Sequence, residues 1–284
     1  MKTRMAAMLI GMALTCGMAV SCGKAQTGQQ ETPDDDAANA ETGYIEQAET
    51  PKPELDMSAI TDADPDMYIM LPDIKTLTIS ITEPEEVTDG EVEEILDSYK
   101  SSVAETFGSG ELTDEAVASL GIVGDDGEKV ETADALRENV RKNLQKRFEE
   151  EAVYSNRDAA ILEVEENAQV LAQYTEPMEE AAEAYILSGA GMLEEEMDDE
   201  TKSALGGYVN TYITEQLIVR KIVKDNNLEV TEKDVIDYLA ETYGEDRAGK
   251  YEGMSDYEKY TYTTMLKKIK AADYILENAI TESD

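Results

Sequence analysis

The longest uninterrupted helical pattern of the chain runs from Thr132 to about Asn167 and contains neither glycine nor proline. Apolar side chains recur along it every four residues, at Leu136, Val140, Leu144 and Phe148. This spacing places them on one face of an α-helix. About 30 helical residues at 1.5 Å each give a length of about 45 Å, which is long for a globular domain. The run therefore predicts a mostly α fold with long helices, either a compact bundle or an open shape with arms.

Capping signals predict further helices on both sides of this run. Thr88 and Glu91 form a capping box before an apolar stripe, and Thr113 begins a helix that Gly121 ends. Further helices are expected to begin near Pro177, Tyr208, Thr231 and Ser255. The segment Ile74–Thr82 differs, because its alternation of β-branched and polar residues predicts a strand. We expect one mostly α domain with a short N-terminal β-strand lead-in.

The composition excludes several classes of function. The chain has 64 acidic and 24 basic residues and a net charge of −40, so we expect it to repel nucleic acid. It has no histidine, which rules out a Ser-His-Asp relay and an imidazole metal site. Asp62, Asp64 and Asp66 alternate as in a calcium loop, but Met67 stands where that loop needs glycine. We expect no metal, no cofactor and no catalytic residue.

The first residues have the pattern of a secretory signal peptide. Lys2 and Arg4 precede an uncharged, mostly apolar run. The sequence Ala-Val-Ser-Cys-Gly at residues 19–23 resembles the lipobox of bacterial lipoproteins, in which the cysteine is lipidated and becomes the mature N-terminus. We expect residues 1–21 to be removed and Cys22 to carry the acyl chains that hold the protein on a membrane. Cys16 is the alternative lipidation site, and a plain secreted protein is the alternative to a lipoprotein.

Residues 22–66 are expected to comprise the lipidated cysteine and a disordered acidic linker. Between residues 23 and 66 there are twelve acidic and two basic residues and few apolar ones, too few to offset the entropy of the chain. We expect residues 67–110 to form a strand–helix lead-in and residues 111–284 to form a helical domain. The expected location is extracytoplasmic, with the protein lipid-anchored to the bacterial cell membrane or cell surface.

Five segments resemble trigger factor, the bacterial peptide-binding chaperone, in the same order along the chain. The C-terminal domain of that family begins with a sequence similar to "ELTDEAVASLG" and "VETADALRENVRKNLQKRFEEEA". Its Val-Pro-Glu helix is similar to "TEPMEEAAEAYI", and its later helices are similar to "LIVRKIVKDNNLEVTEKDVIDYL" and "LKKIKAADYILENAITE". The strand and helix that lead into its prolyl-isomerase domain are similar to "IKTLTISITEPEEVTDGEVEEILDSYK". The resemblance covers about Tyr68 to Ser283.

The resemblance implies that two domains of the family are missing here. In the family, an FKBP-type isomerase domain lies between the helix that ends near Tyr99 and the "ELTDE" segment, where this chain has only Ser101–Gly110. The N-terminal ribosome-docking domain, with its basic Gly-Phe-Arg loop, is absent too. The resemblance therefore implies a lipoprotein form of the C-terminal chaperone domain that is not an enzyme and does not contact the ribosome.

The resemblance implies that the remaining domain has long helical arms around a cavity with scattered apolar side chains. It also implies that this cavity holds unfolded or newly secreted polypeptides. Flexible methionines and tyrosines can adapt to many such clients. The candidate client-binding residues are Met178, Tyr185, Ile186, Met192, Leu193, Tyr208, Tyr212, Ile213 and Met265. Alternatively, these side chains pack helix against helix. We expect a membrane-anchored chaperone, and the alternative is a cell-surface scaffolding or adhesion lipoprotein with one specific partner.

Overall fold

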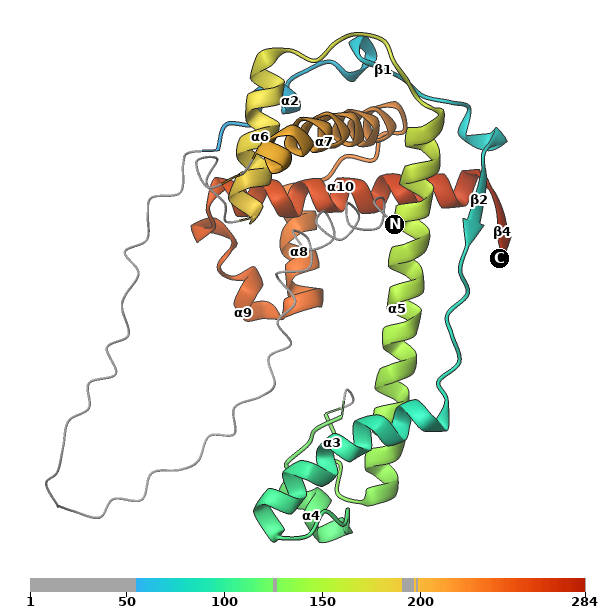
Figure 1. Ribbon diagram of the computed structural model, residues 1–284, viewed down its shortest axis with the longest axis vertical. Helices are drawn as coiled ribbons and strands as arrows, with labels where there is room; N and C mark the ends of the chain where they lie inside the picture. Colours follow the sequence, from blue (N-terminus) through green and yellow to red (C-terminus); the bar gives the residue numbers. More distant parts are fainter. Residues whose placement is uncertain (1–54, 125–126, 191–196, 198, 284) are drawn as a thin grey trace, which may run out of the picture. The chain divides into compact units, whose positions relative to one another are not determined.

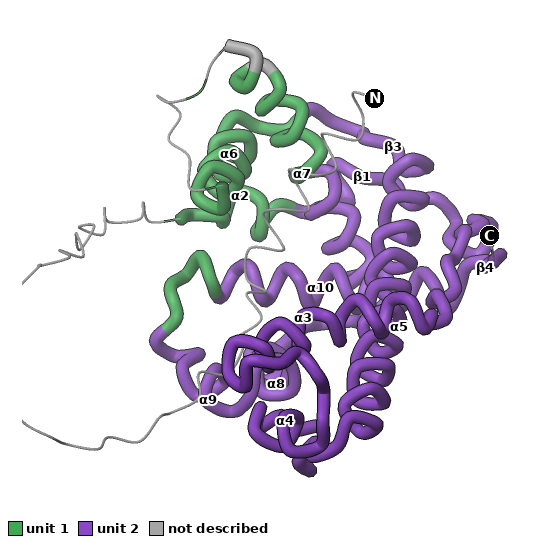
Figure 2. The backbone as a smooth tube through the Cα atoms, turned by 60° about the horizontal axis from the view of Figure 1, so that its bottom comes forward, with its two compact units in different colours: residues 1–63, 174–213, 254–258 green, residues 64–173, 214–253, 259–284 purple. Residues whose placement is uncertain are grey.

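The computed structural model describes residues 55–124, 127–190, 197 and 199–283, and over them the chain is mostly α-helical, as the sequence predicts. The expected signal peptide, Cys16, Cys22 and most of the expected linker lie outside the described residues. The chain divides into two compact units, which Figure 2 colours separately. Unit 1 takes the described residues up to 63 together with residues 174–213 and 254–258. Unit 2 takes residues 64–173, 214–253 and those from 259 onward.

Unit 1 contains α2 (Ser58–Thr61), α6 (Glu176–Ala190), the first half of α7 (Asp199–Asp225) and the start of α10 (Asp256–Asn278). The short helix α2 packs on α6 and buries Ile60, and the neighbouring Met57 is buried as well. The expectation that order begins only after Asp66 is therefore wrong. Met57 and Ile60 supply apolar side chains, and the burial of these side chains stabilises the folded conformation.

The predicted long helix is present in unit 2 as α5 (Ala133–Asn167), one continuous helix of 35 residues, or about 52 Å (Figure 1). The Thr132 hydroxyl accepts a hydrogen bond from the N–H of Ala135 and so caps it. The apolar stripe of its first half packs against α3 (Asp89–Phe107) and α4 (Asp114–Ser119) in a buried cluster of Val92, Leu96, Val117, Val130, Leu136, Val140 and Leu144. Leu136, Val140 and Leu144, three members of the apolar repeat that predicts the helix, are the residues that α5 contributes to this core.

Most of the predicted helix starts are confirmed, but α7 begins at Asp199 and not near Tyr208 as expected. Thr88 and Glu91 form the capping box of α3, and the Thr113 hydroxyl accepts from the N–H of Ala116 at the start of α4. A second capping box opens α8 (Glu232–Tyr243), and the four-residue α9 (Glu245–Ala248) follows it. Gly108 ends α3 with a φ of 73°, a left-handed conformation that favours glycine.

The predicted strand is shorter than expected. Residues Ile74–Thr76 form a 3₁₀ turn (η2), because the Asp73 carboxylate accepts from the N–H of Lys75 and favours the turn over extended backbone. Only β2 (Thr78–Ile81) is extended, and it pairs in parallel with β4 (Ile280–Ser283). A second, antiparallel pair joins β1 (Ile69–Met70) to β3 (Gln169–Val170). Two further 3₁₀ turns are η1 (Pro65–Met67) and η4 (Tyr251–Gly253).

In unit 2, charged side chains connect α5 to α7 and α10. Arg157 of α5 binds the carboxylate of Asp273 of α10 through two nitrogens, at 2.7 and 2.9 Å. Lys268 of α10 pairs with Asp158 of α5 and with Glu215 of α7. Across the described segments, no helix combines the length and the apolar composition needed to cross a membrane.

Candidate functional site

The structure corrects two of the predicted client-binding residues. Met178 of α6 and Ile213 of α7 are only 1% and 0% exposed, so their side chains are buried and offer no surface to a client. For these two residues the packing alternative applies. Met192 and Leu193 lie outside the described residues.

Four other predicted residues are half-buried in unit 1, namely Tyr185, Ile186, Tyr208 and Tyr212. The ring of Tyr185 stacks on that of Tyr212, with 5.0 Å between the ring centres, and on that of Tyr257 at 5.2 Å. Gly189 permits this arrangement, because a Cβ at its position would lie 2.8 Å from the Tyr257 hydroxyl oxygen. The structure thus brings two predicted residues together and adds Tyr257, whose partners are remote in sequence.

The remaining predicted residue, Met265, lies on α10 in unit 2. It contacts a group of tyrosines that the sequence does not predict as a site. Its sulfur accepts a hydrogen bond from the Tyr238 hydroxyl at 3.9 Å. Tyr238 contacts Tyr243 edge to face, and Tyr243 contacts Tyr262 in the same way, with 6.3 Å between ring centres in each pair. The Arg247 guanidinium lies over the Tyr262 ring, 6.0 Å from its centre. We call these five residues the tyrosine cluster.

The tyrosine cluster combines burial with access to the surface. Burial raises the pKa of Tyr238 from 10.0 to about 12 and also raises the pKa of Tyr243. Tyr154 of α5 also contributes to the raised pKa of both groups. Tyr154 and Tyr243 remain 44% and 39% exposed. At neutral pH the phenols are therefore uncharged, and their rings present a mixed apolar and hydrogen-bonding surface.

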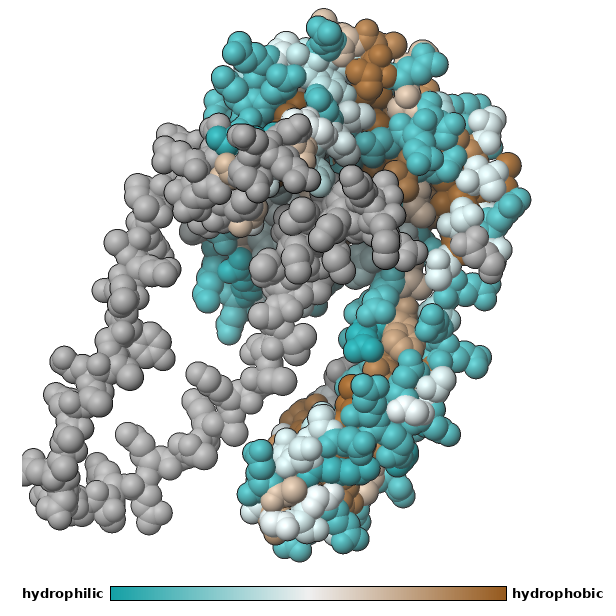
Figure 3. Space-filling model, in the orientation of Figure 1, coloured by the Kyte–Doolittle hydropathy of each residue, from teal (hydrophilic) through white to brown (hydrophobic). Residues whose placement is uncertain are grey.

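A second exposed apolar surface in unit 2 lies along the β1–β3 pair. Its large exposed side chains are Met67, Met70, Val170 and Leu171. The pairing places Ile69 opposite Val170 and Met70 opposite Gln169. Figure 3 shows a mostly hydrophilic surface over the described residues, with a brown patch at the top, where Figure 1 places β1.

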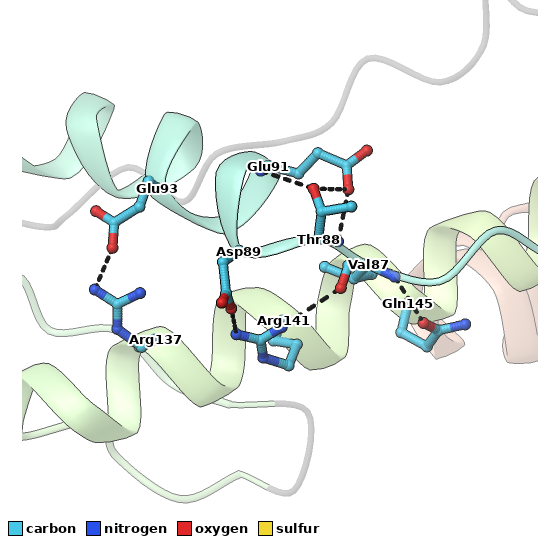
Figure 4. A network of polar contacts seen from close by, with 8 residues as sticks. All are labelled: Val87, Thr88, Asp89, Glu91, Glu93, Arg137, Arg141 and Gln145. Atoms are coloured by element: carbon cyan, nitrogen blue, oxygen red, sulfur yellow. Dashed lines mark hydrogen bonds and ion pairs between the residues drawn. The ribbon is translucent and has the colours of Figure 1, made fainter.

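Ion pairs fix α3 against the first half of α5 (Figure 4). Arg141 binds the carboxylate of Asp89 at 2.6 Å, and Arg137 pairs with Glu93. The hydrogen bond from each arginine is the main cause that lowers the pKa of its carboxyl partner. All four side chains are substantially exposed to solvent, so we assign these pairs a role in orienting the helices rather than in stabilising them.

Two side-chain amides of α5 hold the extended segment 82–87. Asn156 accepts from the N–H of Thr82 at 2.7 Å and donates to its carbonyl at 3.1 Å. Gln145 accepts from the N–H of Val87 at 3.4 Å (Figure 4). It also donates to the carbonyl of Glu85 at 3.5 Å. We call this arrangement the amide clasp. Beside it lies a groove of about 680 Å³ lined by Glu86, Val87, Glu138, Arg141, Lys142, Gln145, Lys146 and Glu149.

The alternating aspartates have a structural role. Lys224 binds Asp64 at 2.9 Å and Asp66 at 2.7 Å, and Lys221 also pairs with Asp66. These pairs connect segment 64–66 to the last turns of α7. Among the residues that the structure describes, no three His, Cys, Asp or Glu side chains converge as metal ligands.

Comparison with known proteins finds a distant similarity to trigger factor. The chain is 27% identical over 172 residues to trigger factor from Agathobacter rectalis and 27% identical over 168 residues to trigger factor from Listeria welshimeri. Each match covers 54% of this chain but only 38% and 39%, respectively, of the relative. The chain thus spans well under half the length of these curated relatives. No protein-family model matches it.

Proposed function

We propose that the protein is a membrane-anchored, extracytoplasmic chaperone that binds unfolded or newly secreted polypeptides. The observation that carries this proposal is the similarity to trigger factor over 54% of the chain. The half-buried tyrosines of unit 1 and the exposed apolar side chains of unit 2 support it, because a chaperone needs accessible apolar surface for clients of varied sequence.

The proposed anchor is Cys22, and its support is the signal-peptide and lipobox pattern of the N-terminal sequence. A surface as acidic as this one would be repelled by anionic lipid, so the acyl chains would have to supply the attachment. Labelling with a radioactive fatty acid tests this proposal. We expect Cys22→Ser to abolish incorporation and Cys16→Ser to leave it unchanged, and the reverse pattern would identify Cys16 as the anchor.

We also propose that the chain has no prolyl-isomerase activity. Residues 101–107 complete α3, and only a short turn at Gly108–Gly110 separates them from the segment that leads into α4. This connection holds no inserted domain. A proline-limited refolding assay should therefore show no acceleration at equimolar protein.

An aggregation assay tests the chaperone function. The chain from residue 23 onward, mixed with a heat-unfolded client, should reduce light scattering at a few-fold molar excess. An unrelated protein of similar net charge serves as the control, because charge alone should not protect. No suppression at a ten-fold excess would overturn the proposal.

The alternative is a scaffolding or adhesion lipoprotein, and the burial of Met178 and Ile213 favours it, because some of the expected client surface is core. A scaffold should retain one partner in stoichiometric amount in a pull-down from its own envelope fraction. A chaperone should retain many proteins weakly, and more of them after heat shock.

A further inference from the structure

Methionine is the most readily oxidised side chain of this protein. From residue 23 onward the sequence has no cysteine, no tryptophan and no histidine. A peroxide that reaches the folded protein therefore reacts first with a thioether sulfur, which it converts to a sulfoxide. Hydrogen peroxide is uncharged, so the net charge of −40 does not repel it.

The described methionines differ widely in exposure. Met67 and Met70 are 66% and 46% exposed. Three others are almost completely buried, at 5%, 1% and 8% exposure: Met57, Met178 and Met254. Two more are half-buried, Met197 and Met265. Since access to the sulfur controls the rate of oxidation, the fold favours two methionines that are three residues apart.

Both exposed methionines lie on an anchored segment of unit 2. Met67 is the last residue of η1 and Met70 the last residue of β1. Between them, Ile69 is 1% exposed, and the carbonyl of Tyr68 accepts from the N–H of Leu171 at 2.8 Å. The two sulfurs are therefore accessible while the backbone is held, and an oxidant reaches them without local unfolding.

The oxidation of each sulfur is a two-electron step. A sulfur lone pair attacks one oxygen of hydrogen peroxide and the O–O bond breaks. The other oxygen leaves as hydroxide, which takes the proton of the transferred oxygen and becomes water. The sulfur loses two electrons and the peroxide gains them, so the products are methionine sulfoxide and water. Methionine sulfoxide reductases reverse the change, with a dithiol oxidised to a disulfide and the oxygen released as water.

We propose that Met67 and Met70 form a paired oxidation site, at which hydrogen peroxide converts both thioethers to sulfoxides and makes the apolar surface along the β1–β3 pair more polar. The sulfoxide oxygen accepts hydrogen bonds from water, so the modified surface adheres less to other apolar surfaces. Val170 and Leu171, each 53% exposed, are the large apolar side chains that remain there. This inference goes beyond the proposed function, because it holds whichever partner the surface has.

Peptide mapping tests the selectivity. The chain from residue 23 onward is treated with a limited dose of hydrogen peroxide and cleaved before aspartates. This cleavage places Met57 in residues 56–61, both exposed methionines in residues 66–72 and Met254 in residues 246–255. We expect Met67 and Met70 to be oxidised at least about ten-fold faster than Met57 and Met254, and the difference to disappear in concentrated urea. Equal rates in the folded protein would overturn the assignment of the site.

A matched variant tests the change in the surface. Met67→Leu, Met70→Leu keeps two exposed apolar side chains of similar size that peroxide does not oxidise. After the same peroxide dose, the unmodified chain should elute earlier from a hydrophobic-interaction column, and the reductases should restore its elution. The leucine variant should not shift, and far-ultraviolet circular dichroism should stay unaltered in both. An equal shift of both proteins, or no shift of the unmodified chain, would overturn the proposal.

Discussion

At the residue scale, the environment of Asp66 shows how local charges act in a very acidic protein. Its carboxylate accepts hydrogen bonds from Lys221 and Lys224, and the bond from Lys221 is the largest cause that lowers its pKa from 3.8 to about 2. A lowered pKa means that the folded state holds this proton less tightly than the unfolded chain. The stabilisation is therefore complete above pH 4 and is lost as the pH falls from about 4 to about 2.

We predict that the Asp66 carboxyl titrates with a midpoint near pH 2, as measured by carbon-detected NMR. In the variant Lys224→Met, one of the two hydrogen bonds is lost and the midpoint should rise toward 3.8. The Phe107→Ser variant is the control and should leave the midpoint unchanged. A midpoint of 3.8 in the unmodified protein would contradict the ion-pair geometry.

Single residues also mark the limit of what could be predicted from the sequence. Thr88, Thr113 and Thr231 were recognised as caps because a cap depends on a neighbour three residues away. Tyr212 and Ile213 are adjacent on α7, yet one is half-buried in a ring stack and the other is fully buried. That difference depends on which helices cover each face, and no local pattern carries this information.

At the element scale, the four-residue helix α2 shows how a short segment can become ordered within an acidic stretch of the chain. It packs on α6, and Ile60 is completely buried there. A segment of mostly polar and acidic residues is expected to remain disordered on composition, but one well-placed isoleucine can reverse that outcome locally. Composition and alternation also mislead about β2. The turn that Asp73 begins interrupts an alternation of residues that predicts a longer strand.

We predict that Ile60→Ala destabilises the protein by about 2–5 kcal/mol, because it removes buried methyl groups and leaves a cavity. Urea unfolding followed by circular dichroism measures this loss. Met67→Ala is the control, because Met67 is exposed and its truncation should change stability by no more than about 0.5 kcal/mol. If both variants unfold at the same urea concentration, α2 is not docked on α6 in solution.

At the scale of the whole molecule, long-range contacts decide the organisation. Mostly helical character and α5 were predicted correctly, because periodicity is a local signal. The division into two units was not predicted, since unit 1 combines segments from three separate parts of the chain. The tyrosine cluster was missed for the same reason, because its side chains come from elements whose proximity only the fold establishes.

The net charge of −40 also acts on the whole molecule. Like charges keep copies apart at low salt, although exposed apolar side chains such as Met70 and Leu171 favour association. We predict that the chain from residue 23 onward sediments as a monomer in 20 mM salt and begins to self-associate as sodium chloride rises to 1 M, because screening removes the repulsion. The variant Met70→Ser, Leu171→Ser should associate less at 1 M. Association that is strongest at low salt would contradict this account.

The amide clasp recognises only main-chain atoms between Thr82 and Val87. The side chains of Glu85 and Glu86 are exposed, and that of Glu86 also lines the groove beside Gln145. The clasp therefore places no direct constraint on the side chain at residue 85, and a cysteine introduced there would carry a fluorophore without removing the hydrogen bonds of either amide. The clasp thus provides a tolerant attachment point from which the motion of α5 could be followed in single molecules.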